Sequence, residues 1–81
     1  MGHGLLRAKA IAINSRLSEG DHNFLRLLRE WDGVATSQDL GPQTSQDQNR
    51  ARQRCKRNGL VTFEGGYWRM TDLGRHVVRE I

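Results

Sequence analysis

Apolar residues in the first part of the chain recur at intervals of three and four positions. A helix over residues 5–17 would carry one apolar stripe, made of Leu6, Ala10, Ile13 and Leu17. The run Ala10-Ile11-Ala12-Ile13 also suits an extended segment, so both structures remain open for it.

A second amphipathic helix is predicted over residues 22–31. Ser18 and Asp21 are both candidates for its N-cap, and Gly33 suits a left-handed exit at its end. Its apolar face consists of Phe24, Leu27, Leu28 and Trp31. We expect Trp31, like Trp68 further along the chain, to lie in the core.

A short extended stub is predicted at residues 33–35. Thr36 and Asp39 then form a capping-box pattern, in which each side chain bonds the backbone at the other's position. The helix that they start is very short, because Gly41-Pro42 follows almost at once.

A second capping box, Ser45-x-x-Gln48, starts a polar helix that is predicted to end at Asn58-Gly59. Five cations and one acid lie within it: Arg50, Arg52, Arg54, Lys56, Arg57 and Asp47. This net charge equals the +4 of the whole chain, so the remaining residues sum to zero. Charge concentrated on one helix indicates a surface that binds a polyanion.

A hairpin is predicted over residues 60–70, with Gly65-Gly66 as a two-residue turn. This register pairs Glu64 with Tyr67, Phe63 with Trp68, Thr62 with Arg69 and Val61 with Met70. It places Val61, Phe63, Trp68 and Met70 on one face. Thr71 then caps a last helix, from Asp72 to about Glu80, with an apolar stripe of Leu73, Val77 and Ile81.

The chain has 81 residues, enough for one small domain with a modest core. The pattern predicts an α+β fold that is mostly α, with an N-terminal extension at 1–20 and the main domain at 21–81. There is no apolar run long enough for a membrane span and no secretory signal pattern, so we expect a cytoplasmic protein.

Helix, stub, short helix, basic helix, hairpin and closing helix is the order of a winged helix-turn-helix domain. Two segments carry the resemblance: Asn49-Arg50-Ala51 through Arg57-Asn58-Gly59-Leu60-Val61, and Trp68-Arg69-Met70-Thr71-Asp72-Leu73-Gly74-Arg75. They resemble the DNA-binding half of MarR-type and related bacterial or phage winged-helix regulators. The resemblance implies a three-helix core, a short two-stranded wing, and a transcriptional regulator that binds double-stranded DNA.

The chain departs from that family in three respects. Its wing has only Gly65-Gly66 at the tip, and the long dimerising helices of full MarR-type proteins are absent. Arg52 stands where the family usually has an apolar residue. We expect its stem to lie along the core edge with its head in water, or its guanidinium to bond the preceding helix.

The predicted basic helix separates into two faces if Gln48, Ala51 and Cys55 point inward. Its opposite face offers the side chains that read base edges in a major groove, namely Gln46, Asn49, Arg50 and Gln53. Contacts to DNA phosphates are expected from Thr44, Ser45, Arg54, Lys56, Arg57 and Arg69. Tyr67 is the wing aromatic expected to touch the sugar-phosphate backbone.

Other chemistry has little support in the sequence. No nucleophile stands with a base and no carboxylates form a pair, so we expect neither enzyme activity nor a cofactor. Three histidines and one cysteine lack metal-ligand spacing, and Cys55 reads as a small core residue.

Two alternatives to DNA binding remain, a protein-interaction module and a domain that binds structured RNA. The fold would also serve as a protein-interaction module, which an unpacked stripe on residues 5–17 would favour. The same stripe could pair two copies of the chain as a homodimer, which would also fit DNA half-sites. A basic surface also suits structured RNA.

Overall fold

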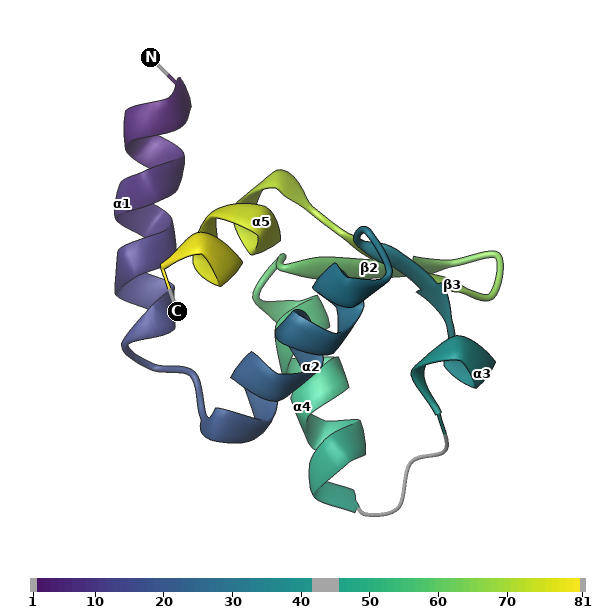
Figure 1. Cartoon of the computed structure of the whole chain (residues 1–81). Coiled ribbons are helices and arrows are strands. Elements are labelled where there is room, and N and C mark those ends of the chain that lie inside the picture. Colours follow the sequence, from purple (N-terminus) through teal and green to yellow (C-terminus); the bar gives the residue numbers. More distant parts are fainter. Residues whose placement is uncertain (1, 42–45, 81) are drawn as a thin grey trace.

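The computed structural model describes residues 2–41 and 46–80. Within them the fold is α+β and mostly helical, with five helices and one three-stranded antiparallel sheet (Figure 1). The elements in chain order are α1 (Gly2–Asn14), α2 (Glu19–Glu30), β1 (Val34–Thr36), α3 (Ser37–Leu40), α4 (Gln46–Arg57), β2 (Val61–Glu64), β3 (Tyr67–Met70) and α5 (Asp72–Arg79). The molecule measures 38 × 23 × 20 Å, with α1 and α5 side by side at one end.

The N-terminal segment is helical, which settles the choice that the sequence left open. α1 begins and ends three residues earlier than predicted, so Leu17 lies beyond its end. Ala10 is fully buried, and Ile13 and Leu17 pack against the core. Three of the four stripe residues are therefore used inside the chain, while Leu6 is half-buried and Leu5 and Ile11 are exposed.

α2 begins earlier than predicted, because Ser18 is the N-cap and Asp21 is its capping-box partner. Two features of its predicted apolar face are wrong. Leu25 is fully buried although it was not assigned to that face, because α2 contacts α4, α5 and the sheet, and the buried arc is wide. Trp31 is 45% exposed and is the C-cap residue, one position beyond the end of α2.

The hairpin has the predicted register at all four pairs, and both turn glycines have positive φ. The stub at Val34–Thr36 adds a third strand, which gives the order β1-β3-β2. Phe63 was expected in the buried set but is 38% exposed. It lies on edge strand β2, where one side of its ring contacts Trp68 and no strand covers the other.

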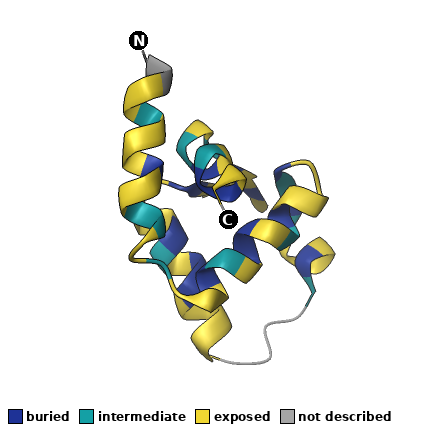
Figure 2. Ribbon diagram, turned by 60° about the vertical axis from the view of Figure 1, so that its left-hand side comes forward, coloured by how far each residue is buried: buried dark blue, intermediate teal, exposed yellow. Residues whose placement is uncertain are grey.

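The buried residues lie where the helices and the sheet face one another, and the outer sides of the helices are exposed (Figure 2). Ala51 and Cys55 point inward from α4 as predicted, whereas Gln48 is exposed. Gln48 comes early in α4, before the part of the helix that the core covers. In α5 the buried pair is Val77 and Val78, with Leu73 half-buried. Ile81, predicted in that stripe, lies outside the described residues.

The predicted start and end signals of the short elements are confirmed. Thr36 and Asp39 form both bonds of a capping box at the start of α3. Thr71 caps α5 by accepting a bond from the Gly74 N–H. Gly33 has φ +84° after α2, and its N–H donates to the Leu28 carbonyl, as in a left-handed helix exit.

Candidate nucleic-acid interface

α4 presents a polar outer face along its whole length. Gln46, Asn49, Arg50 and Gln53, the four predicted base-reading residues, are all exposed on it. At about 100° per residue they fall within one third of the helix circumference. Lys56 and Arg57, predicted for phosphate contacts, are exposed in the last turn of the same helix. The structure therefore brings these six side chains together on one helix.

The inner side of α4 is fixed to α2 by packing. Ala51 and Cys55 are buried against the core, and the Leu60 N–H donates to the Cys55 carbonyl at 2.9 Å where the helix ends. Burial raises the pKa of the Cys55 thiol to about 12, and the nearby Asp21 carboxylate adds to that rise. A thiol in this state is a packing group and not a nucleophile.

Arg54 also fixes α4, in a way that the sequence did not indicate. Its Nε and Nη2 atoms donate to both carboxylate oxygens of Asp21 at 2.9–3.1 Å, and Nη2 also reaches the Ser18 hydroxyl at 3.3 Å. Asp21 is fully buried, and its hydrogen bond and charge raise the pKa of Arg54. The predicted phosphate contact of Arg54 stays a prediction, because Nε and Nη2 make these bonds while the side chain remains 40% exposed.

Asp21 was missed because the sequence offers a sufficient local role for it. It completes the capping box of α2, and its carboxylate accepts a bond from the Ser18 N–H at 3.1 Å. Its second partner lies 33 positions away along the chain. The surplus of cations on the predicted basic helix gave no signal of which cation would bond α2.

Arg50 is held loosely within α4. Its guanidinium is 3.5 Å from the Gln46 side-chain oxygen and 3.7 Å from the Asp47 carboxylate. Both charged side chains of the Arg50–Asp47 pair are largely exposed, so the pair is screened by water and easily exchanged for another partner. Arg50 can thus leave these contacts at little cost when an anion approaches.

The wing carries the remaining predicted contact residues. Tyr67 is 44% exposed, and the Arg69 guanidinium lies 5.8 Å from the centre of its ring. Both side chains point from β3 to the side of the sheet opposite the buried Trp68 and Met70. Thr44 and Ser45, predicted for phosphates, lie outside the described residues, as does the Ser45 half of the predicted capping box.

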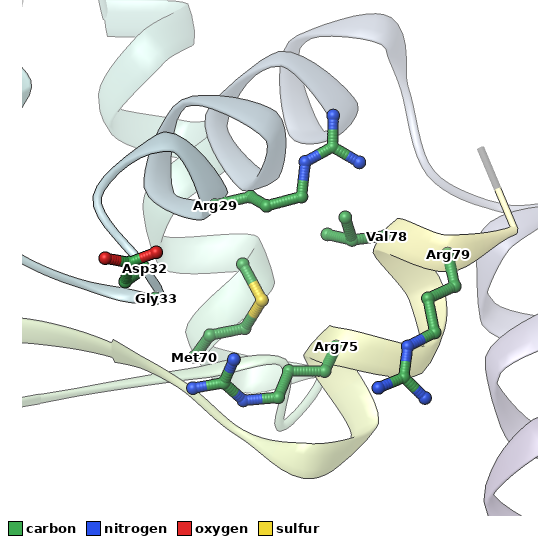
Figure 3. Close-up of a pocket in the computed structure, with 7 residues that line it drawn as sticks. All are labelled: Arg29, Asp32, Gly33, Met70, Arg75, Val78 and Arg79. Atoms are coloured by element: carbon green, nitrogen blue, oxygen red, sulfur yellow. The ribbon is translucent and has the colours of Figure 1, made fainter.

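A second basic cluster lies away from α4, around a cavity of about 280 Å³ (Figure 3). Arg75 and Arg79 extend from α5 and Arg29 comes from α2, with Met70 and Val78 between them. Arg29 and Arg79 occupy the last turns of their helices, where a cation is favoured by the helix dipole. The helix dipole accounts for Arg29 and Arg79 but not for Arg75, and the cluster lacks the Asn and Gln side chains of α4.

In residues 2–41 and 46–80, no three His, Cys, Asp or Glu side chains are grouped to hold a metal ion. None of the helices in this part of the chain has the length and apolar character needed to cross a bilayer.

Comparison with known proteins finds no family, no curated protein and no solved structure that this chain matches.

Proposed function

We propose that this protein binds double-stranded DNA by placing α4 in the major groove, and that it acts as a transcriptional regulator. The outer face of α4 carries the proposal, because it combines amide and guanidinium side chains on a helix whose other face is fixed to the core. Amide side chains bond adenine edges, and guanidinium groups bond guanine edges. A helix face that served only to keep the protein soluble would not need this combination of amides and guanidinium groups.

The order of elements supports the same proposal. A supporting helix (α2), a short helix (α3), a basic helix (α4) and a β2–β3 hairpin follow one another as in a winged helix-turn-helix domain. We propose this domain type for residues 21–81, of the MarR-like kind. In such docking, the N-terminal half of α4 meets bases and the hairpin lies along the backbone.

The position of each residue would decide which part of the DNA it contacts. Gln46, Asn49, Arg50 and Gln53 would contact bases, and Lys56, Arg57 and Arg69 would contact phosphates, with Tyr67 against the sugar-phosphate chain. Arg54 would act indirectly, because its bonds to Asp21 set the angle of α4 on α2.

A titration with a random-sequence DNA duplex tests the proposal. We expect amide NMR shifts in α4 and at residues 67–70, with an affinity that falls steeply as salt is raised. Arg50→Ala is expected to weaken binding, and Lys56→Ala to lower the salt slope by about one. Arg79→Ala removes an exposed arginine of α5 and serves as the matched control, which should leave both quantities nearly unchanged. Shifts spread evenly over all cations, or equal effects of Arg50→Ala and Arg79→Ala, would contradict the docking.

The protein-interaction alternative has lost the observation that would have favoured it. Of the predicted stripe, Ala10, Ile13 and Leu17 pack on the core of their own chain, whereas Leu6 is half-buried and lies outside that cluster. The same packing removes the support for a homodimer through α1. A duplex RNA of matched length is the competitor that separates the RNA alternative from DNA, since an A-form helix does not admit α4 to its major groove.

A further inference from the structure

Arg75 is the member of the second basic cluster that its own helix does not explain. It is the fourth residue of α5, so it lies nearer to the positive end of the helix dipole than to the negative end. Its guanidinium is packed against Gly33, because a Cβ added at that glycine would lie 2.9 Å from Nη2. The absence of a side chain at Gly33 therefore gives this guanidinium its place at the corner between α2 and β1.

The cavity of about 280 Å³ beside this corner has a positive lining. Arg29, Arg75 and Arg79 border it together with one acid, Asp32, which leaves a net charge of +2. All three arginines are exposed. Within residues 2–41 and 46–80, their side chains make no hydrogen bond and no ion pair, not even with Asp32. Their charge is thus available to an anionic partner.

The three guanidinium groups lie apart, on different sides of Met70 and Val78 (Figure 3). One small anion could not meet all three, whereas a chain with several carboxylates could. Met70 and Val78 form an apolar floor between the charges, and the arginine stems add apolar surface around it. A DNA backbone offers phosphates and sugars to such a floor but no apolar side chain, so a protein segment fits it better.

We propose that the second basic cluster docks an acidic segment of a partner protein, and that an apolar side chain of this segment packs against Met70 and Val78. Guanidinium groups bind carboxylates through paired hydrogen bonds, a geometry that favours arginine over lysine. In an extended segment, alternate side chains share one face, so acids two positions before and after an apolar residue would lie beside it. No residue of the cluster belongs to α4, and the inference is therefore independent of DNA binding.

The peptide acetyl-DEDLDED-amide is a suitable probe, with acetyl-NQNLNQN-amide as its uncharged match. At about 0.15 M salt, which screens exposed charges beyond about 8 Å, we expect the acidic peptide to cause saturable amide NMR shifts at Gly33, Met70 and residues 72–79. The uncharged peptide should bind at least about tenfold more weakly. Acetyl-DEDSDED-amide, which lacks the apolar side chain, should bind at least about threefold more weakly. No saturable shift, or equal affinities of the three peptides, would overturn the proposal.

Two arginines of α2 give a matched pair of variants. Arg29→Gln removes a charge of the cluster, and Arg26→Gln removes an exposed charge of the same helix outside it. Affinity for the acidic peptide should fall about threefold in Arg29→Gln and stay nearly unchanged in Arg26→Gln. The double variant Arg75→Gln/Arg79→Gln should lose about tenfold. Equal affinities of Arg29→Gln and Arg26→Gln would mean that the peptide responds only to net charge, and would refute the cluster.

A DNA duplex distinguishes this proposal from a further DNA contact. Arg50→Ala, which is expected to weaken duplex binding, should leave the affinity for the acidic peptide unchanged. The double variant Arg75→Gln/Arg79→Gln should show the reverse, with wild-type affinity for the duplex. If the double variant lost duplex affinity, the cluster would contact DNA phosphates and the acidic partner would be wrong. Loss of peptide binding in Arg50→Ala would place the peptide on α4 and would also overturn the proposal.

Discussion

Arg52 and Arg54 are two positions apart on one helix, yet their guanidinium groups have opposite surroundings. Arg54 meets a buried carboxylate with good geometry, and Arg52 meets an aromatic ring and one unpaired N–H. Their sequence positions predicted neither environment, because each depends on which residue of α2 lies opposite. At the residue scale, charge on α4 is therefore divided between a structural contact, a buried group and an outer face.

Breaking the Asp21–Arg54 contact should destabilise the fold. We expect Asp21→Asn to lower the free energy of unfolding by about 1–3 kcal/mol, a range reduced because the Arg54 side chain is 40% exposed. Urea denaturation measures the change. Asp47→Asn is the matched control, because its bridge to Arg50 is exposed, and it should cost less than about 1 kcal/mol. Equal losses in the two variants would show that the buried pair contributes nothing special.

Cys55 predicts a specific loss of stability at high pH. Its thiol ionises near pH 9.0 when exposed and near 12 in the folded chain, so the unfolded state alone loses the proton between these values. Stability from this group is thus full below about pH 9 and falls as the pH rises toward 12. Urea denaturation measures the free energy of unfolding at about pH 8 and at about pH 10.5. Between these two values it should fall by about 1–2 kcal/mol more in the wild type than in Cys55→Ala. If the free energy of unfolding fell equally in the two proteins, the Cys55 thiol would be ionising in the folded protein as well.

At the scale of elements, α5 approaches the chain at Leu60 more closely than any side chain would allow. A Cβ added at Gly74 would collide with the Leu60 carbonyl oxygen and contact the Met70 side chain. The Thr71 N–H also donates to that carbonyl at 3.0 Å, which holds the start of α5 against the end of α4. The glycine is thus required by the packing of α5 and not by its backbone angles.

Gly74→Ala should therefore lower the free energy of unfolding by about 1–3 kcal/mol or more, because α5 must move outward. Gly4→Ala is the matched control on another helix, where an added Cβ meets nothing within 4 Å. That change should raise stability by up to about 1 kcal/mol, as alanine favours a helix over glycine. Thermal denaturation compares them, and a shift of both midpoints in the same direction would contradict the close approach.

The elements that the sequence predicted well are those set by neighbouring residues. The hairpin register follows from Gly65-Gly66 and the alternation beside it, and the caps at Thr36 and Thr71 act within one helical turn. The errors concern faces, as at Leu25 and Trp31, since what covers a helix depends on distant segments. For the candidate interface, the outer face of α4 was predictable from spacing, whereas the bonds from Arg54 to Asp21 were not.

At the scale of the whole molecule, α1 is attached through α5 rather than through the sheet. Ala10 is fully buried at this contact, and Arg7 reaches Glu80 at 3.6 Å near its outer edge. This ion pair contributes little, so the attachment depends on the apolar stripe and on the hydrogen bond that Asn14 of α1 shares with His22 of α2.

Ala10→Asp should detach α1 and cost about 2–4 kcal/mol, because a carboxylate cannot be buried there without a partner. Ala8→Asp places the same residue on the exposed side of α1 and should cost less than about 1 kcal/mol. Hydrogen exchange of the α1 amides together with thermal denaturation distinguishes the two. Retained amide protection in Ala10→Asp would mean that α1 does not depend on this contact.

The strand order β1-β3-β2 affects how this molecule behaves in concentrated solution. Only β3 is paired on both sides, so β1 and β2 are the two edges of the sheet. These edges are three and four residues long, and short edges offer few unpaired backbone groups to a strand from another molecule. The sheet is thus a poor template for amyloid-like growth.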